Sequence, residues 1–171
     1  MLLKRVWKNN RGIISEIENN TFYIKEYYNQ VLSKLSPQEI YEQLDNSVLL
    51  CYEDNNEFCH RHIVSAWLEL FLDIEVNEKS CENDFMKTIE KPAYIKETLE
   101  NIVKKEVNMR GFHSLRALYL FELGEKCEMK AHENERKNYD SYMQAACFYR
   151  CDADEAEAIY NFNKFNSFIK L

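Results

Sequence analysis

Residues 47–72 read SVLLCYEDNNEFCHRHIVSAWLELFL, a short apolar run, a polar loop and a longer apolar segment. The first run, 47–53, is bounded by Asp and Asn residues on both sides, and its length is typical of a buried strand. The segment that starts at Cys59 repeats large apolar side chains on one face, which predicts a helix over 59–72. We therefore expect a strand, a loop and a helix in this order.

The residues on either side extend this unit. Residues 73–76 (DIEV) predict a second short strand, so that strand, helix and strand form a partial Rossmann-like βαβ unit with a right-handed crossover. Upstream, apolar side chains at helical spacing predict a helix over 21–35 with Thr21 as its N-cap. Ser36, followed by Pro37, predicts the start of a second helix, which should end near residue 44.

The rest of the chain is helical in pattern. We treat the polar stretch 78–92 as a linker and expect helices over 93–107, 113–136 and 139–168. In the last helix, apolar residues recur in alternating steps of three and four, which predicts a seam against a neighbouring helix. Three small residues on this seam allow a close approach: Ala146, Ala153 and Ala156. The sequence therefore predicts a helical hairpin over 113–168.

Composition agrees with a mostly helical protein. The 171 residues include only three glycines and two prolines, whereas strand-and-turn architectures need more of both. Hydrophobic residues make up 46% of the chain, enough for a buried core. We expect a predominantly α fold with a small α/β element: a truncated α/β domain at 1–77, the linker at 78–92 and a helical extension at 93–171.

Charge and cysteine usage bear on partners and location. The formal charge of −7 disfavours broad binding to nucleic-acid backbones. One local exception is a basic arm that could contact phosphates or an acidic partner, with a solvated terminus as the alternative: Lys4, Arg5, Lys8 and Arg11. The six cysteines lack the spacing of a small secreted scaffold, so we expect reduced thiols, a cytoplasmic location and no membrane contact.

Five polar residues fall at fixed spacing around the predicted strand, loop and helix: Cys51, Glu53, Cys59, His60 and Arg61. In this pattern, residues 20–77 resemble the carboxy-terminal half of a bacterial and phage family called domain of unknown function 488. That family has a hydrophobic strand ending in Cys-x-Glu, a short loop, and Cys-His-Arg opening a helix. The resemblance implies a shortened α/β fold and a candidate site at these residues. It implies no substrate, because the reaction of the family is not established.

The chemistry of the motif leaves two interpretations open. At a helix N-terminus and beside His60 and Arg61, the Cys59 thiol would have a pKa lowered into a range of ~3.5–7.5. These three residues could then form a nucleophilic site or a phosphate cradle, supported by Cys51, Glu53 and His62. Alternatively, Cys59 is a small core residue and Arg61 pairs with Glu53.

A metal site is disfavoured by the spacing. Cys51, Cys59, His60 and His62 offer four donors, but Cys-x7-Cys-His-x-His matches no common zinc pattern. The two histidines also diverge by ~200° on a helix. The sequence therefore predicts neither a metal nor another cofactor.

Two classes of function follow. The first is a small interaction protein that acts through protein–protein contacts, either with a macromolecular partner or by self-association. The second is a thiol-dependent enzyme, or a phosphate- or nucleotide-binding domain, that uses Cys59 and Arg61. The shortened sheet and the tyrosine-rich helical seam favour the interaction protein.

Overall fold

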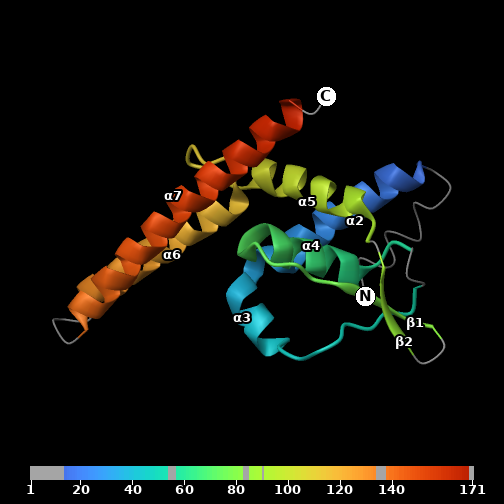
Figure 1. Ribbon diagram of the computed structural model, residues 1–171, viewed down its shortest axis with the longest axis horizontal. Coiled ribbons are helices and arrows are strands. Elements are labelled where there is room, and N and C mark those ends of the chain that lie inside the picture. The colour runs from blue at the N-terminus through green and yellow to red at the C-terminus, as the bar shows by residue number, and fades with distance from the viewer. Residues whose placement is uncertain (1–13, 54–56, 83–84, 90, 134–137, 170–171) are drawn as a thin grey trace. The chain divides into compact units, whose positions relative to one another are not determined.

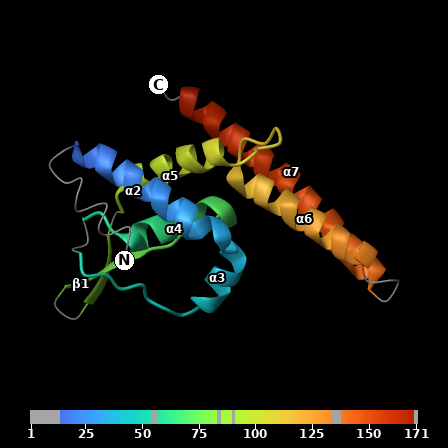
Figure 2. The ribbon, with the colours of Figure 1, turned by 180° about the vertical axis from the view of Figure 1, so that it is seen from behind.

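The computed structural model describes residues 14–53, 57–82, 85–89, 91–133 and 138–169, with side chains at all of these except 80–82, 85–89 and 167–169 (Figures 1 and 2). The chain divides into two compact units, Met1–Val107 and Asn108–Leu171. The division therefore falls after Val107 and not at the expected linker, 78–92. The basic arm predicted at residues 4–11 lies outside the described residues.

The first unit is built from helices and one β-hairpin. Its helical elements are α2 (Glu16–Gln30), the 3₁₀ turn η1 (Leu32–Lys34), α3 (Pro37–Gln43), α4 (His60–Leu72) and α5 (Ala93–Glu106). Helix α5 packs against both α2 and α4, which explains why the predicted linker does not separate two domains. The predominance of helix confirms that part of the expected fold class.

Two helix starts show how the local sequence sets the elements. The Ser15 hydroxyl accepts a hydrogen bond from the Glu18 amide at 3.2 Å, and the Glu18 carboxylate accepts one from the Ser15 amide at 3.0 Å. This reciprocal pair starts α2 at Glu16, so the predicted N-cap at Thr21 is wrong and Thr21 lies within the helix. The predicted start of α3 is confirmed, with Ser36 as N-cap and Pro37 as the first helical residue.

Helix α4 supplies the centre of the core of the first unit. Its buried side chains include Ile63, Trp67 and Leu68, which are at most 3% exposed. Helix α5 buries Leu99 and Val103 completely. Burying each large apolar side chain of this kind contributes roughly 1.5–3 kcal/mol, so the contact between α4 and α5 is a main source of stability. The predicted helix over 59–72 is confirmed, with Cys59 as its N-cap residue.

The expected strands on either side of α4 are not formed. Residues 47–53 and 73–76 have no β-pairing, so the described residues contain no βαβ unit. The sheet that they do contain is an antiparallel hairpin of β1 (Glu78–Glu82) and β2 (Phe85–Ile89), inside the predicted linker. The physical reason is that a strand needs a neighbouring strand for its amide and carbonyl groups, and no strand among the described residues pairs with 47–53. Val48 and Leu50 are 66% and 89% exposed, contrary to the expected burial of this apolar run.

The second unit is a helical hairpin, as the sequence predicts. Helices α6 (Leu115–Glu133) and α7 (Tyr139–Ile169) run antiparallel, since Glu128 pairs with Arg150 and His113 pairs with Glu157. The two helices lie side by side in both views (Figures 1 and 2).

Small residues line the contact between these helices. Ala146 and Ala153 are each 1% exposed, and Ala156 is half-buried. A Cβ built on Gly124 would lie 3.2 Å from the Ala146 carbonyl oxygen, so α6 approaches the backbone of α7 closely there. The alanine seam predicted from the heptad spacing therefore holds at Ala146 and Ala153.

Candidate functional site

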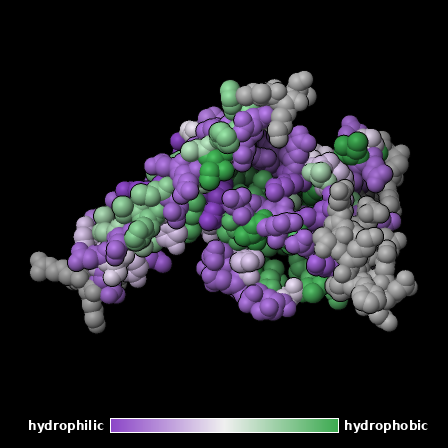
Figure 3. Space-filling view, in the orientation of Figure 1, coloured by the Kyte–Doolittle hydropathy of each residue, from purple (hydrophilic) through white to green (hydrophobic). Residues whose placement is uncertain are grey.

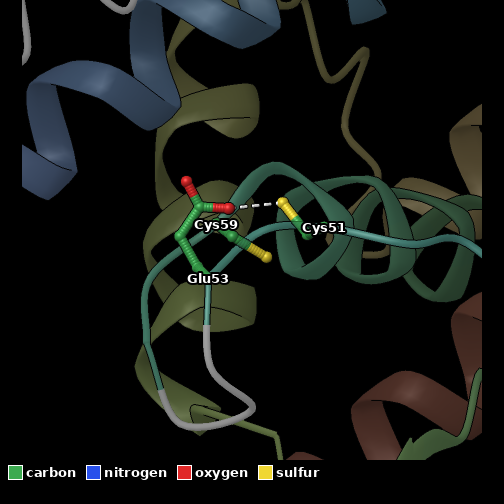
Figure 4. Close-up of side chains that lie close together, drawn as sticks. All are labelled: Cys51, Glu53 and Cys59. Carbon is green, nitrogen blue, oxygen red and sulfur yellow. Dashed lines mark hydrogen bonds between the residues drawn. The ribbon is translucent and has the colours of Figure 1, made fainter.

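The motif residues meet where the segment before α4 turns into the helix. Cys51 and Glu53 lie in that segment and Cys59 is the N-cap residue of α4, so the backbone turn brings their side chains together (Figure 4). The Cys51 thiol donates a hydrogen bond to the Glu53 carboxylate, with Sγ and Oε2 2.6 Å apart. The two sulfur atoms and a carboxylate oxygen all lie within 4.8 Å of one another. Three potential metal donors therefore converge in space.

Arg61 lies in the first turn of α4 and makes two polar contacts. Its Nε donates to Oε1 of Glu78 at 2.8 Å, and its Nη1 donates to the Glu53 carbonyl oxygen at 3.2 Å. The expected proximity of Arg61 and Glu53 is present, with a hydrogen bond to the main-chain carbonyl oxygen of Glu53. The side chains of Arg61 and Glu78 are nearly buried, at 11% and 8% exposed respectively. Burial lowers the pKa of Arg61, but Glu78 outweighs this and keeps the pKa above its ordinary value.

Sequence reasoning missed Glu78 altogether. This residue opens β1, in a stretch that we expected to be a linker, and lies 17 positions after Arg61. No local pattern marks it, because its role depends on the fold returning β1 to the start of α4.

His62 is the most enclosed polar side chain of the group, at 2% exposed. Its Nδ1 lies 3.9 Å from the Cys59 sulfur. Its Nε2 lies 3.2 Å from Oε2 of Glu78, at ion-pair distance but not aligned for a hydrogen bond. Burial lowers the pKa of His62, with Glu78 opposing this effect, so the ring is neutral near pH 7.

His60 lies apart from this cluster and faces helix α2. Its Nε2 contacts the Tyr23 hydroxyl, and its ring lies edge-on to Tyr23 and Tyr27 with centroids 5.5 Å away in each case. These contacts give His60 a packing role between α2 and α4. His60 and His62 therefore point in different directions, as their spacing on a helix requires.

The environment of Cys59 does not activate its thiol. The residue is 3% exposed. Burial raises the pKa of the thiol to about 11, while a backbone hydrogen bond and the Arg61 charge act in the opposite direction. The expectation of a lowered pKa is therefore wrong, because the free-energy cost of burying a thiolate exceeds the stabilisation that the helix N-terminus and one guanidinium provide.

An open pocket of about 600 Å³ lies beside the cluster. Its lining includes Cys51, Arg61 and Lys91. A third cation of the lining is Lys79. Arg61 pairs with Glu78 and Lys91 with Glu69, and the carboxylates of Glu53 and Glu78 line the same pocket. The pocket therefore does not offer the unopposed positive charge that a phosphate cradle needs.

Comparisons with family models, with curated proteins and with solved structures give no match to this chain. Within the described residues, no helix is both long enough and apolar enough to cross a membrane.

Proposed function

We propose that this chain is a small interaction protein that acts through protein–protein contacts, and that the end of α7 binds a second copy of the chain. The observation that supports this is a stripe of exposed apolar side chains. Ile159, Phe162 and Phe165 are 48%, 65% and 63% exposed. Aromatic side chains are enriched in protein interfaces, and grouped exposed apolar residues on a soluble protein mark binding surfaces.

The stripe lies where α6 no longer covers α7. Glu157 accepts hydrogen bonds from the amides of His113 and Ser114, just before α6 begins. Residues of α7 beyond Glu157 therefore run past the end of α6 (Figures 1 and 2). Spacing by three residues places Ile159, Phe162 and Phe165 along one side of the helix. Apolar patches also break the hydrophilic surface of the hairpin on the face drawn in Figure 3.

Symmetry and charge favour a second copy as the partner. In an antiparallel pair of α7 ends centred on Phe162, Ile159 of one copy meets Phe165 of the other. Before the stripe, α7 exposes acidic residues at Asp154 and Glu155, whereas Lys164 lies within it. In this pairing Lys164 of one copy lies opposite Tyr160 of the other, and the acidic residues Asp154 and Glu155 of the two copies lie at opposite ends of the contact. The acidic segments therefore do not face one another, which limits the repulsion expected from a net charge of −7.

The test is the mass of the full-length chain as a function of concentration, measured by analytical ultracentrifugation. We expect a monomer–dimer equilibrium, and we expect Phe162→Ser to weaken it more than tenfold, because removal of a central aromatic anchor costs about 2 kcal/mol or more. Phe148→Ser is the matched control, since Phe148 is 62% exposed on the same helix but lies outside the stripe. A wild-type chain that stays monomeric at its highest soluble concentration would contradict the proposal, as would a dimer that Phe162→Ser leaves intact.

The thiol-dependent or phosphate-binding alternative has less support. Cys59 is buried with a raised pKa, and Arg61 already has a carboxylate partner. Membership of the domain of unknown function 488 family is also part of the proposal, and it is supported by the spacing of the motif residues in the sequence.

A further inference from the structure

We propose that Cys51, Glu53 and Cys59 bind a thiophilic divalent cation of the zinc class, with His62 as the fourth donor. This site is independent of the α7 stripe and concerns the first unit alone. The spacing in the sequence disfavoured a metal for a donor set that included His60 and not Glu53. In the structure, His60 faces α2 while Glu53 lies between the two thiols in sequence and beside them in space (Figure 4).

The separations of three donor atoms are compatible with one ion, whereas His62, whose Nδ1 lies near the Cys59 sulfur, must turn towards the other two to complete the site. Zinc binds sulfur at about 2.3 Å and carboxylate oxygen at about 2.0–2.2 Å, so neighbouring ligand atoms of a tetrahedral site lie about 3.5–3.8 Å apart. The sulfurs of Cys51 and Cys59 and a Glu53 oxygen lie within 4.8 Å of one another. Cys51 and Glu53 lie outside helices and strands, so rotation of their side chains can close the remaining difference.

The surroundings of His62 match a common feature of metal-binding histidines. Such a histidine usually binds the ion with one ring nitrogen while a carboxylate holds the other. His62 places Nδ1 3.9 Å from the Cys59 sulfur and Nε2 3.2 Å from Glu78. Glu78 in turn accepts a hydrogen bond from Arg61, which also donates to the Glu53 carbonyl. The outer contacts therefore link two proposed ligands, His62 and Glu53.

The protonation of the thiols agrees with this chemistry. Without a cation, burial keeps Cys59 protonated. On binding, each thiol loses its proton to solvent and forms a metal–thiolate bond, while Glu53 binds as the carboxylate. No oxidant or reductant takes part. The bound ion would join the segment that contains Cys51 and Glu53 to the first turn of α4, and so hold a stretch that no sheet supports.

The experiment is a metal titration of the full-length, fully reduced and chelator-treated chain. Co²⁺ serves as a spectroscopic probe, because thiolate ligands give it intense sulfur-to-metal charge-transfer absorption, and Zn²⁺ should then displace it. We expect one ion per chain, with about two protons released for each ion bound. Thermal melting of the wild-type chain should shift upwards with Zn²⁺, since the ion binds the folded state.

Substitutions separate this site from other thiols. Cys51→Ser and Cys59→Ser should each lower the charge-transfer absorption by about half or more, and the variant that lacks both thiols should show no band. Glu53→Gln should weaken binding by ~10–100-fold or more, since loss of an outer contact alone typically costs that much. The matched control is the double variant Cys147→Ser/Cys151→Ser, which removes two exposed thiols one turn apart on α7 and should keep the band. Circular dichroism of each variant reports whether the helices remain.

Three results would overturn the inference. The first is the absence of a charge-transfer band in the wild-type chain with Co²⁺ in excess. The second is a band of wild-type intensity in folded Cys51→Ser or Cys59→Ser. The third is a band lost in the Cys147→Ser/Cys151→Ser control, which would assign it to the exposed thiols of α7.

Discussion

Replacement of Ala153 by leucine tests the packing of the helical hairpin. Ala153 is 1% exposed and lies seven residues after Ala146 on the same face of α7. Near Ala146, α6 approaches so closely that a methyl group on Gly124 would lie 3.2 Å from a backbone oxygen and 3.4 Å from the Arg150 side chain. A seam with so little clearance leaves no room for the three additional carbon atoms of leucine.

The expected cost follows from this geometry. Overpacking a close-packed contact costs about 1–3 kcal/mol of unfolding free energy. For a chain of 171 residues, each kcal/mol lowers the melting temperature by roughly 2–4 °C. Ala153→Leu should therefore melt about 2–12 °C below the wild-type chain, as measured by circular dichroism at the helix signal.

The matched control is Ala158→Leu. This position is exposed on the same helix, so the same substitution adds the same atoms without entering the seam. Its unfolding free energy should stay within about 0.5 kcal/mol of the wild-type value. Equal melting temperatures for Ala153→Leu and Ala158→Leu would show that Ala153 does not lie at a tight contact, and would refute the packing argument.

Three further predictions concern titratable groups. Iodoacetamide should label Cys59 more slowly than the exposed Cys147 in the native chain, because burial raises the pKa of the Cys59 thiol to about 11. After unfolding, the two thiols should react at similar rates. Peptide mapping by mass spectrometry measures the labelling, and fast labelling of Cys59 in the native chain would contradict the prediction. Burial raises the pKa of Glu157, but hydrogen bonds from the amides of Ser114 and His113 outweigh this and hold the pKa below its ordinary value. The stabilisation is therefore present at neutral pH and is lost as pH falls through the folded-state pKa. The melting temperatures of the wild-type chain and Glu157→Gln should differ at neutral pH and converge in acid. Glu78→Gln leaves Arg61 without its carboxylate and should cost about 3 kcal/mol in a urea titration, whereas an unchanged midpoint would mean that the pair contributes nothing.

The sequence by itself determined the helices of this protein and one of their contacts. The cap at Ser36, the apolar face of α4 and the heptad seam of α7 all follow from residues within a few turns of one another. Helical hydrogen bonds join residues four apart, so the information that specifies a helix is local. The short sequence spacing of Cys51, Glu53, Cys59 and Arg61 likewise predicted that these residues meet.

Only the tertiary structure decided what those residues do. The run 47–53 has the composition of a strand, but no strand in the described part of the chain pairs with it, and pairing depends on distant residues. Glu78 reaches Arg61 and His62 because β1 returns to α4, which no local pattern records. Burial, which the surrounding helices impose, raises the pKa of Cys59 where the sequence predicted a lower value. Desolvation and ion pairing are set by which groups surround an atom in space, and residues far apart in the sequence supply those groups.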